Sequence, residues 1–415
     1  MNTAMDAHPV RLVVEDDLGR SRLTVFFRLL LAIPHYIWFS LWSIAVAVVV
    51  LVQWLVILVR ARPAAGLHRF LERYVRYTVH LSAYLYLAAS PFPPFDGDSP
   101  YPMTLEPIEP ERQSRLGAFF RLVLAIPCVL LQVAFFGVLG GARGGPYGFY
   151  FSLVALVGLC SVLTWWHALV LGRAPRGLRD VTAYALGYQA QVGAYTLLVT
   201  GRYPSADPTA MLGGVARPPQ HPVHLEGDAG DLRRSRLTVF FRLPLVVPHY
   251  VWLALWNYAA VVVGLINWFA TLFMGRSPRW CHRFLSRYIR YQFHVLAFLS
   301  LAANPFPGFT GRSGSYPLDL ALPAEPQRQN RWKTGFRLVL AIPAWIVCIG
   351  LYSALAIAAM CTWFASLATG RAPWGLRNLL AFVLRYVAQT NAYVFLLTDR
   401  YPHASPLEGE DEAPA

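Results

Sequence analysis

Four segments of the chain repeat one pattern of side chains that are able to bind a polar molecule or to exchange protons. Each segment has a His or Gln that follows a tyrosine by three residues. Positions four residues before that tyrosine and four after the His or Gln extend the row along one helical face. The repeated pairs are Tyr77 and His80, Tyr188 and Gln191, Tyr291 and His294, and Tyr386 and Gln389.

Three roles are open to this polar stripe. The side chains can hydrogen-bond between helices as packing contacts, because polar groups that lie in hydrocarbon must find partners. They can line a site for a ligand or a lipid headgroup. They can also serve catalysis or permeation, with His80 and His294 as the candidate acid–base residues.

Two arginine clusters adjoin the first and third of these segments. A guanidinium group binds phosphate oxygens through two parallel hydrogen bonds, so the clusters predict binding of anionic headgroups. The alternative is that long arginine side chains reach the interface without a specific ligand. The candidate residues are Arg69, Arg73, Arg76, Arg283, Arg287 and Arg290.

Motifs for other chemistry are missing from the sequence. We find no HExxH, GxSxG, paired carboxylates or CxxC, so we expect no catalytic centre, no metal site and no cofactor. The only lysine, Lys333, lies outside any Walker A motif, which excludes a P-loop ATPase. The net charge of +14 comes with arginines beside apolar runs, which favours lipid phosphate over nucleic acid as the partner.

The elements that position these residues are apolar. The chain is 56% hydrophobic and only 14% charged, and no charged residue lies between Leu29 and Val59. A helix of roughly 20 apolar residues crosses a bilayer. Pro34 divides this run, so we predict a short interfacial helix before the proline and a spanning helix from Tyr36 to Val59.

The same unit occurs four times. A Phe-Arg-Leu sequence followed by a proline marks each copy, with its arginine at Arg28, Arg121, Arg242 and Arg337. Each copy opens with a short strand-like segment and ends with the striped helix. The predicted boundaries are 1–100, 101–205, a linker at 206–220, 221–310, 311–402 and an acidic disordered tail at 403–415.

Copy two carries an insertion that includes the glycine-rich segment Gly140–Gly148. Copies one and three are most alike, as are copies two and four, which indicates that one unit was doubled and the pair was then doubled.

These features predict an all-α integral membrane protein made of four tandem two-helix units, with proline-broken interfacial helices and short extramembrane strands. If both long helices of every unit span, the protein has eight spans and all four units share one orientation. If the striped helices lie in the interface, four spans remain. We expect the arginine-rich turns in the cytoplasm and the strands outside.

The sequence resembles a bacterial membrane family, domain of unknown function 4389. The resemblance is carried by the openings such as His8–Leu12, the segment Leu31–Tyr36, the turn Gly172–Leu178 and the closing Arg202–Pro204, with counterparts in each unit. The turn of unit one departs by a one-residue shift to Arg62-Pro63. The resemblance implies a multi-pass protein of the bacterial plasma membrane, and it implies no reaction.

We therefore predict a non-enzymatic scaffold that binds anionic lipid or an envelope protein partner through its arginine-rich turns. The alternative is a transporter or channel for an anionic or amphipathic solute, lined by the Tyr/His/Gln stripes. An intramembrane enzyme is the third hypothesis. A dry, interlocked stripe favours the scaffold, whereas water along it favours transport.

Overall fold

The computed structural model describes residues 8–137, 155–213, 215, 217–227 and 231–409. The predicted insertion at Gly140–Gly148 and the last residues of the predicted tail lie outside the described residues. Two compact units are present, one formed by residues 1–216 with 405–407 and the other by 217–404 with 408–415. Each unit thus contains two of the four sequence copies, which we call repeats one to four.

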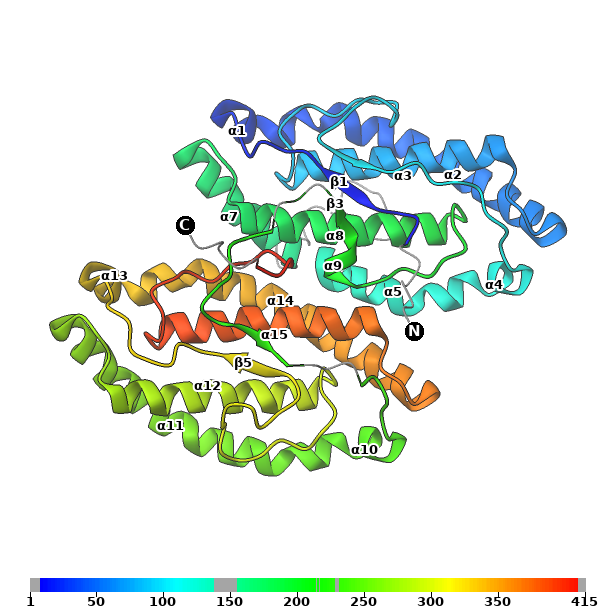
Figure 1. Ribbon diagram of the computed structural model, residues 1–415. Coiled ribbons are helices and arrows are strands. Elements are labelled where there is room, and N and C mark those ends of the chain that lie inside the picture. The colour runs from blue at the N-terminus through cyan, green and yellow to red at the C-terminus, as the bar shows by residue number, and fades with distance from the viewer. Residues whose placement is uncertain (1–7, 138–154, 214, 216, 228–230, 410–415) are drawn as a thin grey trace. The chain divides into compact units, whose positions relative to one another are not determined.

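The N-terminal unit is mostly helical (Figure 1). Repeat one has α1 (Arg22–Leu31), α2 (Ile33–Arg60) and α3 (Ala65–Leu85), and repeat two has α4 (Arg115–Phe119), α5 (Arg121–Phe136), α7 (Leu156–Leu171) and α8 (Arg176–Thr196). The short strands β1 (Leu12–Val14), β2 (Met103–Leu105) and β3 (Leu212–Gly213) form a sheet in the order β2-β1-β3. The segment predicted as a linker holds β3 and the short helix α9 (Pro208–Met211).

The C-terminal unit repeats this plan. Repeat three has β4 (His224–Glu226), α10 (Arg236–Phe240), α11 (Arg242–Met274) and α12 (Arg279–Leu299), and repeat four has β5 (Asp319–Ala321), α13 (Arg331–Gly335), α14 (Arg337–Thr369) and α15 (Trp374–Val394). Strands β4 and β5 pair antiparallel, as β1 and β2 do. The four strands predicted at the openings of the repeats are thus confirmed.

The helices within each unit form two layers. The long apolar helices, α2 with α5 and α7, or α11 with α14, pack against the striped helices, α3 with α8, or α12 with α15. The strands contact the striped helices from their other side. The striped helices therefore form the middle of each unit, and this position explains why so many of their polar residues are buried.

The prolines do not break the helices where the sequence suggested. Pro127, Pro248 and Pro343 lie inside continuous helices α5, α11 and α14, and the break comes earlier, at the Phe before the repeated arginine. In repeat one the break falls at Ala32, two residues before Pro34. A proline removes only one helical hydrogen bond, so an apolar helix continues through it with a bend.

The described residues include three helices that are long and apolar enough to cross a membrane, namely Arg22–Arg60, Arg242–Met274 and Arg337–Thr369. Helices α5 and α7 are apolar but shorter. The striped helices are not among these candidates, so the structure gives no support to eight spans.

The two repeats of a unit run in opposite directions. The backbone N–H of Gln113, at the start of repeat two, donates to the carbonyl of Ala61 in the turn of repeat one (3.0 Å), and Arg20 donates likewise to Gly172 (2.8 Å). Turn and start of one repeat are separated by the length of α2, about 42 Å at 1.5 Å per residue. The prediction that all repeats share one orientation is therefore wrong, because each turn is held by the start of the neighbouring repeat.

Candidate functional site

The polar stripe is buried and interlocked. Tyr77 and His80 are both 0% exposed. The hydroxyl of Tyr77 shares a hydrogen bond with Nδ1 of His35 on α2 (2.8 Å), and Tyr291 pairs with His249 in the same way (2.7 Å). In repeats one and three, the tyrosine at the second stripe position thus ties the striped helix to the apolar helix of its own repeat.

The third position of the stripe faces the extended segments. His80 Nε2 lies 3.4 Å from Thr104 Oγ1 in β2, and His294 Nε2 lies 2.8 Å from Asp319 Oδ1 in β5. Gln191 donates to the carbonyl of Val10 (3.0 Å), and Gln389 donates to that of Val223 (2.8 Å). His and Gln are therefore equivalent here, because both form a hydrogen bond with the segment that covers the helix.

The ends of the striped helices are held by the repeated arginine, whose role the sequence analysis missed. The guanidinium of Arg28 lies 4.3 Å from the ring centre of Tyr84 and donates to the carbonyls of Tyr84 and Ala89. Just beyond the helix, Leu87 has a φ of 61°. The charge therefore caps the orphan carbonyls of the helix end and of a strained left-handed turn.

The other three repeats have the same arrangement. Arg121, Arg242 and Arg337 lie 4.1 Å, 4.3 Å and 4.1 Å from the aromatic ring at the fourth stripe position. The left-handed residue is again a leucine, at Leu198, Leu301 and Leu396. The signal in the sequence was an arginine kept in all four copies inside an otherwise apolar run.

Burial controls the protonation of the stripe histidine in repeat one. Loss of solvent, helped by the positive charge of Arg76, lowers the pKa of His80 to about 4, so its ring is neutral at pH 7. Burial acts to raise the pKa of Asp319, but hydrogen bonds from His294 and from backbone N–H groups lower it overall. The protonation states of His80 and Asp319 are thus set by burial and by neighbouring groups of the protein.

The predicted arginine clusters divide into paired and free residues. Arg76 pairs with Glu72 (2.6 Å), Arg73 pairs with Asp98 (2.5 Å), and Arg290 is buried beside Asp319 (3.4 Å). No ion pair of Arg69, Arg283 or Arg287 is found among the described residues, and all three are exposed. These three are available to an external anion.

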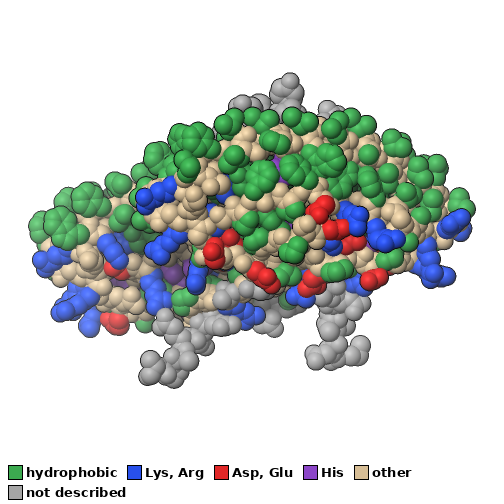
Figure 2. All heavy atoms as spheres, turned by 90° about the horizontal axis from the view of Figure 1, so that it is seen from above, with side chains coloured by type: hydrophobic (Ala, Val, Ile, Leu, Met, Phe, Trp, Pro, Cys, Tyr) green, Lys and Arg blue, Asp and Glu red, His purple; other side chains and the backbone are tan. Residues whose placement is uncertain are grey.

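The apolar helices expose many large hydrophobic side chains. Hydrophobic side chains gather in patches, largely apart from the arginines and carboxylates (Figure 2). The exposed residues recur at three- and four-residue intervals along α2, as one helical face requires. They are Ile37, Leu41, Ile44, Val48, Leu51, Leu55 and Val59.

The opposite side of the striped helices carries extended, charged chain. Segment 101–108 follows α3 from His80, near Tyr101, to His68, whose Nε2 lies 2.7 Å from the carbonyl of Ile108. Glu106 in this segment and Glu109 just after it are exposed. One side of the unit is therefore apolar and the other is charged along the helix.

The described residues contain no group of three or more His, Cys, Asp or Glu side chains placed to hold a metal ion. Cys128, Cys160, Cys281 and Cys348 are buried and Cys361 is half-buried, and none of the five forms a disulfide among the described residues. Burial raises the pKa of the Cys281 thiol, which disfavours the thiolate. No catalytic grouping is evident in this part of the chain.

Fold and site together define a class: helical proteins built from paired antiparallel repeats, with one apolar face and a buried polar stripe. The chain belongs to the family described as domain of unknown function (DUF4389), whose model matches residues 22–96, 146–206, 236–310 and 331–405. This confirms the resemblance and its four tandem copies, although the strands lie outside the matched ranges. No curated protein and no solved structure matches the chain.

Proposed function

We propose that the chain is a non-enzymatic membrane scaffold whose units lie flat in one leaflet. The apolar faces of α2, α5, α7, α11 and α14 enter the hydrocarbon, and the extended segments stay in water. The observation that carries this proposal is the pair of exposed carboxylates, Glu106 and Glu109, on the extended chain that lies along the striped helix α3. A protein partner would bind the charged side.

The flat orientation follows from what the striped helices carry. Segment 101–108 runs beside α3 between His80 and His68, a length of about 18 Å at 1.5 Å per residue. If α3 crossed a bilayer, this segment would cross with it. Glu106, Glu109 and the open edges of a short sheet would then lie in hydrocarbon, where unsatisfied groups each cost several kcal/mol.

Arginines at the ends of the apolar helices support headgroup binding. Arg22 donates to the carbonyl of Val170 (2.9 Å) and Arg115 donates to that of Val59 (2.7 Å), so both guanidinium groups lie at helix ends while remaining exposed. Arg60 and Arg62 are exposed at the same turn as Arg115. An anionic leaflet would add about 1 kcal/mol per such residue.

The cytoplasmic leaflet of the bacterial plasma membrane suits this arrangement, because anionic lipid gives it a negative surface. Multi-pass insertion remains the alternative for the three long helices. Transport is the less favoured function, since the stripe side chains have protein partners and are buried along their length.

Spin-label depth along α2 tests the orientation. Labels at Leu41, Val48 and Leu55, introduced one at a time into a cysteine-free chain in vesicles, should report similar shallow depths if α2 lies flat. A spanning α2 would place the middle label deepest by many ångströms. A label at Glu109 should be accessible to water-soluble quencher, and its burial in lipid would refute the proposal.

Flotation with vesicles tests the lipid preference separately. Replacement of Arg69, Arg283 and Arg287 by glutamine should weaken binding to vesicles with 30% phosphatidylglycerol by about tenfold or more, given about 1 kcal/mol per residue. Binding to neutral vesicles should change little. Arg290→Gln is no suitable control because Arg290 is buried, so Glu109→Gln serves instead. Equal losses on both vesicle types would contradict headgroup recognition.

A further inference from the structure

The N-terminal unit has a pocket that opens on its apolar face. Its volume is 370 Å³, within the range of about 300–1,000 Å³ that small-molecule sites occupy. Helices α3 and α8 form its floor, and Phe39 of α2 and Leu122 of α5 stand on opposite sides. Leu122 is 80% exposed, so the entrance faces the same surroundings as the apolar helices.

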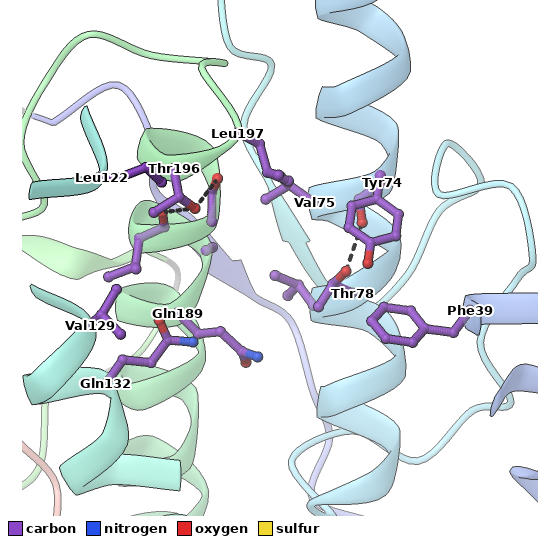
Figure 3. A pocket seen from close by; sticks show the side chains of 14 residues that line it. Phe39, Tyr74, Val75, Thr78, Leu122, Val129, Gln132, Gln189, Thr196 and Leu197 are labelled. Carbon is purple, nitrogen blue, oxygen red and sulfur yellow. Dashed lines mark hydrogen bonds between the residues drawn. The ribbon is translucent and has the colours of Figure 1, made fainter. Parts of the chain in front are cut away.

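The lining is uncharged but not wholly apolar. Gln132 of α5 and Gln189 of α8 extend toward α3, which supplies Tyr74 and Thr78 (Figure 3). Oε1 of Gln189 is buried and has no hydrogen-bond partner among the described residues. An unpaired buried amide oxygen calls for an O–H or N–H donor. A ligand with a free hydroxyl and no charge fits this lining.

The C-terminal unit has the same helices but a filled pocket. At the place of Leu197 it has Phe395, whose ring reaches Gly264 of α11 so closely that no Cβ fits between them. At the place of Gly193 it has Asn391, which donates to Gln292 Oε1 across the floor (3.0 Å). The space that remains is 10 Å³, about one water.

The polar groups also differ between the two units. Positions equivalent to Gln132 and Gln189 are Cys348 and Val387 in the C-terminal unit, by alignment of the repeats. The N-terminal unit thus has open space beside the unpaired Gln189 Oε1, whereas the C-terminal unit has little space and its Asn391 and Gln292 amides bond each other. This joint change is what a binding site requires, whereas a packing defect would not need the glutamines.

We propose that the N-terminal unit binds a neutral lipid with a free hydroxyl, of the acylglycerol kind, which enters from the leaflet between α2 and α5. The hydrocarbon chain lies against Phe39, Leu122 and Val129, and the hydroxyl donates to Gln189 Oε1. The proposal deepens the membrane scaffold above and rests on contact of the apolar face with lipid.

Bound lipid in the purified full-length protein tests this inference. The protein is incubated with vesicles that contain 1,2-dioleoylglycerol, separated, and its lipid is measured by mass spectrometry. We expect one molecule per chain, and competition by monooleoylglycerol but not by trioleoylglycerol, which lacks a hydroxyl. Competition by oleyl alcohol would show that any hydroxyl suffices, and equal competition by trioleoylglycerol or oleate would overturn the proposal.

Two variants transfer the filled state. Gly193→Asn with Leu197→Phe, made together with Val50→Gly at the position equivalent to Gly264, should abolish retention. Gln189→Val should reduce retention about tenfold through loss of the hydrogen bond. The added Cβ at Gly193 meets only Val75 methyls at 3.9 Å, so folding should survive, and circular dichroism checks this. Phe395→Leu in the other unit is the control and should leave retention unchanged.

Retention of dioleoylglycerol by the filled variant would refute the proposal that the lipid binds in this pocket. Vesicle flotation of the same samples separates the two proposals. If the protein floats with vesicles but retains no dioleoylglycerol, the pocket proposal fails and the scaffold proposal stands. If the protein does not float, it lacks the membrane contact on which both proposals depend.

Discussion

At the scale of single residues, one arginine per repeat does the most structural work. Arg28 and its counterparts lie in the apolar layer, yet their guanidinium groups bind backbone carbonyls and contact an aromatic ring within the protein. The same end is reached by a second polar residue, because Arg20 donates to Leu87 and Gln113 donates to Leu198. Each left-handed leucine turn is therefore fixed from two directions.

The turn of repeat one predicts a stabilising substitution. Ala61 has a φ of 55°, whereas glycine occupies the equivalent position at Gly172, Gly275 and Gly370. A left-handed conformation costs an L-residue roughly 1–2 kcal/mol. Ala61→Gly should therefore raise the free energy of unfolding by about 1 kcal/mol in denaturant titrations. Gly275→Ala is the matched reverse change and should lower it, and stabilisation by both would contradict this explanation.

The stripe histidine predicts sensitivity to acid. The pKa of His80 is about 4 in the folded chain, below its ordinary value of 6.5, so the unfolded chain binds more protons between these values. The contribution of His80 to the free energy of unfolding is complete above pH 6.5 and falls by about 3 kcal/mol as the pH drops to 4.

His80→Gln, which places in repeat one the residue type found at Gln191, should remove this acid-induced decrease in the free energy of unfolding. Unfolding free energies of both proteins across pH 4–7 check this. Parallel pH profiles would show that His80 does not contribute.

At the scale of elements, the unit of folding is a pair of repeats. Repeat two supplies Gln113, whose backbone binds the turn of repeat one at Ala61 and whose side chain accepts from Arg121 (2.6 Å) at the end of its own striped helix. Neither repeat completes its hydrogen bonds alone. The doubled chain therefore forms a pair of repeats in which each repeat hydrogen-bonds the turn of the other, in place of a series of equivalent membrane spans.

This reciprocity predicts that damage at one start spreads to both repeats. Gln113→Ala removes a buried partner of Arg121 and of the Leu198 carbonyl, at a cost of about 2 kcal/mol. Hydrogen exchange should then quicken at residues 196–200 of repeat two and at 61–66 of repeat one. Glu109→Ala, an exposed change nearby, is the control. Faster exchange in repeat two alone would contradict the paired arrangement.

At the scale of the whole molecule, the two units share one plan but have diverged in detail. Both keep the apolar helices, the capped striped helices and the strands, while only the N-terminal unit keeps the open pocket. Duplication thus left one copy free to specialise in packing. The surplus of basic residues, +14 overall, and the exposed apolar residues both fit the proposed contact with an anionic lipid surface.

The sequence by itself determined the four copies, the strand at the opening of each repeat, the striped helices, and the apolar character of the long helices. These properties are local, because they depend on composition and spacing over a few tens of residues. The family match confirmed the copies, and the structure buries Tyr77, His80 and their counterparts.

Only the tertiary structure decided the antiparallel pairing of the repeats, the capping role of Arg28, the continuous helices at Pro127, Pro248 and Pro343, and the pocket. The pairing, the capping and the pocket depend on segments about 50 to 180 residues apart, such as Ala61 with Gln113 or Val10 with Gln191. Local periodicity carries no information on which distant carbonyl an arginine will reach, or on whether Leu197 or Phe395 stands beside a gap.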